Sequence, residues 1–143
     1  MLSADCRLIV DGRLILLVAV LATACGSGFT AVQKPTVIEW RRVGSWSGRG
    51  VVQTETFTSD TGGFRVHWET RNETRPGAGT LKVVFRSGDS GRDIIDAVDT
   101  RGVGHGTADV STERPRWYYL GIESANLEWT VTVEEPIMGV ARD

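Results

Sequence analysis

The sequence predicts an all-β protein: an antiparallel β-sandwich of about eight strands in a jelly-roll or Greek-key arrangement, preceded by an N-terminal signal segment. Three observations predict this class. From about residue 36, short β-prone segments alternate with clusters of Gly, Pro, Asp and Ser. Inside several segments, apolar and polar residues alternate with a period of two, which is typical of strands with one buried face. No long helical period follows residue 35.

The expected strands are separated by turn-forming stretches such as SDTGG, RPGAG and SGDSG. Such stretches supply Gly for positive φ, Pro for a fixed φ, and Asp or Ser for side-chain turns. In chain order the strands are Val37–Val43, Gly50–Thr58, Phe64–Arg71, Thr80–Arg86, Asp93–Asp99, Gly106–Ser111, Trp117–Glu123 and Leu127–Glu134. The sandwich domain is therefore expected over residues 36–135, with a C-terminal tail at 136–143.

The faces of these strands follow from the alternation. Trp40, Trp68 and Trp129 fall on apolar stripes, so we expect them in the core. Glu134 and Glu135 precede a proline, and their pattern indicates a charged strand end. One buried and one wet face for each strand is the arrangement expected of two facing sheets.

The N-terminal segment has the features of a signal peptide over residues 1–24. The uncharged run Leu14–Ala24 is eleven residues long, whereas a membrane-spanning helix needs about 20. Arg7 and Arg13 precede the run, and small residues close it. This length and these flanks favour an h-region over a membrane span or a buried helix.

The residues at the end of this run, Ala22-Thr23-Ala24-Cys25, resemble the lipobox of bacterial lipoproteins. The resemblance implies that Cys25 receives a diacylglyceryl group and becomes the first residue of the mature chain. Residues 25–35 would then hold the lipidated cysteine and a Gly/Ser-containing flexible tether. It implies a membrane partner and a location at the cell membrane, on its extracytoplasmic face. The alternatives are an ordinary secretory signal, in which Cys25 is incidental, and an uncleaved anchor.

The C-terminal segment RPRWYYLGIESANLEWTVTVEE resembles the closing hairpin of small secreted bacterial β-sandwiches, including pre-peptidase C-terminal-type domains. The resemblance covers about 20 residues and implies the fold only, because no catalytic residue of those families matches a position here.

The net charge and the spacing of potential metal ligands indicate which partners the sequence disfavours. The net charge is −2 with both signs interspersed, which argues against a nucleic-acid partner. His67 lies on the polar face of its strand and His105 in a Gly-rich loop, and neither has the local third ligand of a zinc site. Asp93, Asp96 and Asp99 lack EF-hand spacing, so solvated charges are favoured over a weak calcium site. We expect no metal and no cofactor.

The sequence contains no recognisable catalytic constellation, so we expect a binding or structural module of the cell envelope rather than an enzyme. Its ligand would be an envelope protein, a glycan or a lipid. An alternative is a carbohydrate-binding jelly-roll, because Trp46 in a Gly-flanked loop and Trp117 at a strand start could present exposed rings. A third hypothesis, an enzyme, would need Asp96 or Asp99 in a cleft beside a second acid.

Overall fold

The computed structural model of the chain describes residues 36–113 and 116–140, which form the predicted β-sandwich. The strands of this part are β1 (Thr36–Arg49), β2 (Val52–Gln53), β3 (Phe57–Thr58), β4 (Gly63–Arg71), β5 (Thr80–Ser87), β6 (Asp93–Arg101), β7 (Gly104–Ser111), β8 (Trp117–Ala125) and β9 (Glu128–Val140). None of the described residues belongs to a helix long and apolar enough to cross a membrane. The expected signal segment, Cys25 and the expected tether lie outside the described residues.

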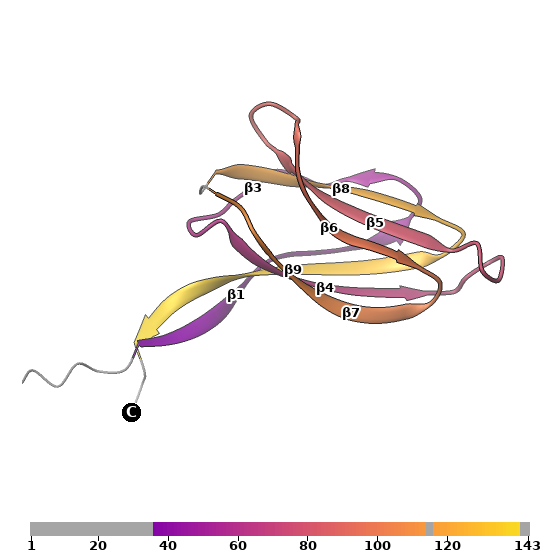
Figure 1. The fold of residues 1–143 in the computed structure, drawn as a ribbon, viewed down its shortest axis with the longest axis horizontal. Helices are drawn as coiled ribbons and strands as arrows, with labels where there is room; N and C mark the ends of the chain where they lie inside the picture. The colour runs from indigo at the N-terminus through magenta and orange to yellow at the C-terminus, as the bar shows by residue number, and fades with distance from the viewer. Residues whose placement is uncertain (1–35, 114–115, 141–143) are drawn as a thin grey trace, which may run out of the picture. The chain divides into compact units, whose positions relative to one another are not determined.

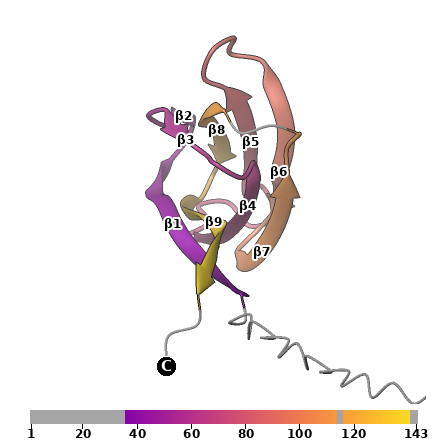
Figure 2. The same cartoon turned by 90° about the vertical axis from the view of Figure 1, so that its left-hand side faces the viewer.

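The strands form two antiparallel sheets (Figures 1 and 2). Sheet A has the order β1-β9-β4-β7, and sheet B the order β2-β8-β5-β6, with β3 also paired to β8. If β2 and β3 are counted as one interrupted strand, this is the order of a jelly roll, in which two Greek keys are folded into two facing sheets. The expected fold class is confirmed.

The core lies between the inner faces of β4 and β9 in sheet A and of β5 and β8 in sheet B. Phe64, Phe85 and Tyr118 are at most 1% exposed and pack ring against ring, with the Phe64 and Phe85 centroids 4.7 Å apart. Trp129, on β9, is fully buried as expected. Aromatic pairs of this kind add to the stability that burial alone provides.

Three of the expected strands differ from the observed ones. The expected strand Val37–Val43 is longer, because β1 continues to Arg49. The expected strand Gly50–Thr58 is broken into β2 and β3, each of two residues. At the other end, β9 continues past Glu134 and through Pro136 to Val140, across most of the segment that we expected to be a tail. The extension is stabilised by β1, which pairs with β9 from Arg49↔Glu128 to Thr36↔Val140.

A β-bulge interrupts β1, since the register with β9 shifts between Arg42 and Gly44. A bulge inserts one extra residue, here Val43, and so reverses which residues of a strand face inward. After the bulge along the chain, Gly44 and Trp46 lie on the inward face of β1. Before the bulge, Arg41 lies on that face. The far parts of β1 and β9 project from the sandwich as a two-stranded ribbon (Figure 1).

The expected placements of Trp40 and His105 are wrong. Trp40 is not in the core. It is 37% exposed, and the Arg65 guanidinium lies 3.9 Å from its ring centroid. His105 is not in a loop, because β7 begins at Gly104 and pairs His105 with Glu69 of β4.

Candidate functional site

The groove that we consider the candidate site, called here the Trp117 groove, lies where β1, β3 and the start of β8 meet. It has a volume of about 460 Å³ and is lined by Arg41, Arg42, Val43, Thr56, Phe57, Thr58, Trp117 and Glu135. Its rim combines an exposed indole with threonine hydroxyls and guanidinium groups. A concave site with apolar surface and a few convergent polar groups is the usual form of a ligand-binding site.

Trp117 forms one wall of the groove. It is 53% exposed, and its backbone is fixed on two sides. It pairs with Thr58 of β3, and its carbonyl accepts a hydrogen bond of 2.9 Å from the amide of Gly88. A Cβ atom on Gly88 would lie 2.8 Å from the Trp117 Cβ, so only glycine allows this close approach. Thus a rigid backbone presents a largely exposed ring.

The floor of the groove is the carboxylate of Glu135, which is 0% exposed. Arg41 Nη2 donates to its Oε1, and the Ser59 hydroxyl donates to Oε2 over 2.9 Å. The Asp60 amide donates to the same oxygen over 3.3 Å. Both carboxylate oxygens therefore have partners, as a buried charge requires.

The partners of Glu135 set its ionisation. Burial alone raises the pKa of a carboxyl group. Here the hydrogen bonds from Arg41 and Ser59, the charge of Arg41 and the Asp60 amide outweigh burial and lower the pKa of Glu135 below its ordinary value. In turn, the hydrogen bond and charge of Glu135 raise the pKa of Arg41. The floor of the groove is thus a permanent ion pair near neutral pH.

Sequence reasoning missed Glu135, although a signal was present. Trp129, Val131 and Val133 are all 0% exposed, and Glu135 continues their alternation on the same face of β9. We expected a charged strand end because Pro136 follows, and that expectation is wrong. The inward position is occupied by a carboxylate, and the bulge at Val43 brings Arg41 to meet it.

The two tryptophans that the sequence singled out do not share the groove. Trp117 lines it, whereas Trp46 lies on β1 rather than in a loop and faces the core. The Trp46 ring centroid is 5.9 Å from that of Phe57, and its Nε1 donates to both oxygens of Glu55 over 3.1 Å. Since Trp46 is half-buried with its donor engaged, Trp117 is the better placed of the two for stacking on a ligand.

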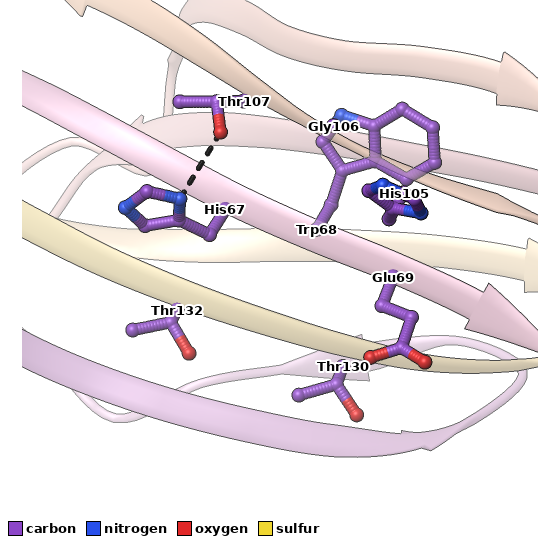
Figure 3. A pocket seen from close by; sticks show the side chains of 8 residues that line it. All are labelled: His67, Trp68, Glu69, His105, Gly106, Thr107, Thr130 and Thr132. Carbon is purple, nitrogen blue, oxygen red and sulfur yellow. Dashed lines mark hydrogen bonds between the residues drawn. The ribbon is translucent and has the colours of Figure 1, made fainter.

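A second hollow, of about 430 Å³, lies on the outer face of sheet A. Figure 3 shows its lining, which consists of His67, Trp68, Glu69, His105, Gly106, Thr107, Thr130 and Thr132. Both histidines of the chain line this hollow, because β4, which carries His67, pairs with β7, which carries His105. His67 is already engaged, through Nδ1 with Thr107 at 3.1 Å and through Nε2 with Glu134 at 3.0 Å.

In the described ranges, no three His, Cys, Asp or Glu side chains are grouped so that they could hold a metal ion. On β6, Asp93 pairs with Arg86 at 2.6 Å and Asp96 pairs with Lys82 at 3.1 Å. These carboxylates are solvated ion-pair partners on the outer face of sheet B.

No family model matches the chain, and no curated protein matches it significantly.

Proposed function

We propose that this protein is a lipoprotein anchored to the extracytoplasmic face of the cell membrane through Cys25, and that its β-sandwich is a binding module of the envelope. The anchor is inferred from the lipobox-like residues at the end of a signal-type segment. The binding role is inferred from one observation, which is the Trp117 groove with an exposed indole on a hydrogen-bonded backbone.

Binding is favoured over catalysis because of the state of Glu135. An efficient general base has a pKa near the operating pH, whereas the partners of Glu135 lower its pKa below the ordinary value. Both oxygens of Glu135 are engaged, by Arg41 on one side and by Ser59 and Asp60 on the other. The carboxylate therefore shapes the floor and fixes Arg41 in place, and it does not act on a bound molecule.

The anchor is tested by the intact mass of the protein purified from its own host, with Cys25→Ser as control. We expect a mature chain that begins at Cys25 and carries a diacylglyceryl group, which the control lacks. A chain that is cleaved but carries no lipid would contradict the anchor and make the protein a secreted one.

A carbohydrate ligand is the second candidate, and the position of Trp117 favours it. A flat indole stacks on the apolar face of a sugar ring, while Thr56 and Thr58, both exposed on the same groove, can bond its hydroxyls. This arrangement uses Trp117 alone and does not need Trp46 as the second ring that the sequence indicated.

Glycan-array binding of the full chain tests this candidate. We expect Trp117→Ala to weaken binding about tenfold or more relative to the wild type. Trp117→Phe should retain part of the affinity because an aromatic ring remains. Trp40→Ala is the matched control, since Trp40 is another exposed tryptophan outside the groove. Equal losses for Trp117→Ala and Trp40→Ala would contradict a glycan site in the groove, and the absence of any glycan signal would direct the search to protein partners.

A further inference from the structure

The ribbon at the end of sheet A, defined as residues 36–40 of β1 and 136–140 of β9, has one exposed apolar face. Among the described residues each of these strand segments pairs only with the other, because the pairing of β4 with β9 ends at Arg65↔Glu134. Ile38 lies directly opposite Met138, and they are 61% and 79% exposed. A two-stranded ribbon that exposes paired large apolar side chains to water is unfavourable, so we expect this face to be covered by another surface.

The two faces of the ribbon differ. Trp40 and Pro136, the next cross-strand pair on that face, share the face of Ile38 and Met138. The opposite face is mixed, because it carries Glu39 paired with Ile137. On the opposite face the side chain of Glu39 lies over Gly139, where a Cβ atom would meet the Glu39 carboxyl carbon at 3.0 Å. Arg65 holds Trp40 by its cation–π contact, so the apolar face is supported where it joins the sandwich.

The position of this face along the chain indicates what covers it. Thr36, the first described residue, is eleven residues after Cys25, and eleven residues span at most about 40 Å. A lipid on Cys25 would therefore hold the ribbon within that distance of the bilayer, at a high effective concentration. The ribbon is also the end of the domain at which β1 begins (Figure 1).

We propose that the apolar face of the ribbon docks on the lipid surface, with Ile38 and Met138 at the boundary between headgroups and acyl chains. Trp40 has the residue type that is enriched at this boundary. The exposed Arg42 follows it along the same face and can reach lipid phosphates. Docking of this kind would orient the sandwich and hold the Trp117 groove at a fixed height. The proposal rests on the proposed lipid anchor.

The test places a fluorescent reporter on the ribbon of the lipidated mature protein. Met138→Cys is labelled with an NBD maleimide, and the protein is reconstituted in phosphatidylethanolamine–phosphatidylglycerol vesicles with or without a headgroup-nitroxide lipid. Met138 is 79% exposed, so the substitution leaves the fold intact. The matched control is Val103→Cys, which replaces an apolar residue 61% exposed in the turn between β6 and β7, at the other end of the sandwich.

We expect the label at 138 to emit at shorter wavelength and to lose most of its emission to the nitroxide lipid, while the label at 103 keeps its emission. Unquenched emission at 138 would overturn the proposal, including the case of a blue shift without quenching, in which protein covers the ribbon. Equal quenching at 138 and 103 would also overturn it. Labelling of the unsubstituted chain separates the two proposals, because a lipidated Cys25 takes no maleimide and an unlipidated one does.

Discussion

The two halves of the β1–β9 strand pair have the same kind of sequence and opposite surroundings. In the half within the sandwich, Trp129, Val131 and Val133 are 0% exposed, because β4 lies beside β9 and sheet B covers their face. In the ribbon, Ile38 and Met138 are more than half exposed, because no third strand pairs there within the described residues. The difference teaches that alternation predicts a strand, while the neighbours of the strand decide how much each residue buries.

The boundary between the halves is where the polar chemistry lies. The bulge at Val43 and the buried carboxylate of Glu135 occur at the last residues before the ribbon. Arg41 faces this carboxylate from β1. A bulge re-aims side chains, and here it turns Arg41 toward Glu135 at the base of the ribbon.

The largest effect should come from the buried half. We expect Trp129→Ala to lower the free energy of unfolding by about 4 kcal/mol, because it removes a fully buried ring and leaves a cavity. The same substitution in the ribbon, Trp40→Ala, should cost about 1 kcal/mol, mainly for the lost contact with Arg65. Urea unfolding followed by far-UV circular dichroism measures both. Equal losses would mean that the ribbon is as tightly packed as the sandwich.

The boundary should give an intermediate effect that depends on pH. Glu135 has a lower pKa in the folded chain than the ordinary value of 4.5. Its contribution to stability is therefore complete above about pH 4.5 and lost as the pH falls through the folded pKa. At pH 7 we expect Glu135→Gln to cost about 2 kcal/mol, less than for a fully enclosed pair because Arg41 is half-exposed.

Unfolding midpoints measured between pH 7 and about pH 3 test this sign. The difference between wild type and Glu135→Gln should narrow on acidification. Glu69→Gln, a substitution of an exposed carboxylate on the outer face of sheet A, is the control and should leave the pH profile close to that of the wild type. A difference that is constant with pH would contradict a contribution from the ionised carboxylate of Glu135.

The sequence predicted the fold class and the bounds of five strands, β4 to β8, to within about two residues, because period-two alternation and turn residues are local signals. The bulge at Val43 is not visible in the sequence, since Val-Gly within a strand is also compatible with regular pairing. The inward position of Glu135 was predictable from the alternation of β9, but its partners Arg41 and Ser59 come from segments more than 70 residues away. Likewise, Trp117 was selected correctly as an exposed ring, whereas the half-burial of Trp46 depends on Phe57 and Glu55 across a turn.

The smallest effect on folding should come from the tip of the ribbon. Met138→Ser removes an apolar side chain that is 79% exposed, so we expect the free energy of unfolding in water to change by less than about 0.5 kcal/mol. Val131→Ser, a polar substitution at a buried position of the same strand, is the matched comparison and should be strongly destabilising. On vesicles the effect of Met138→Ser should become larger, because a docked ribbon buries the methionine against lipid and the loss of this side chain then weakens attachment. The effect of Val131→Ser should stay the same. A large loss of stability in water would show that Met138 packs against protein. The ribbon would then be a continuation of the core rather than a docking surface.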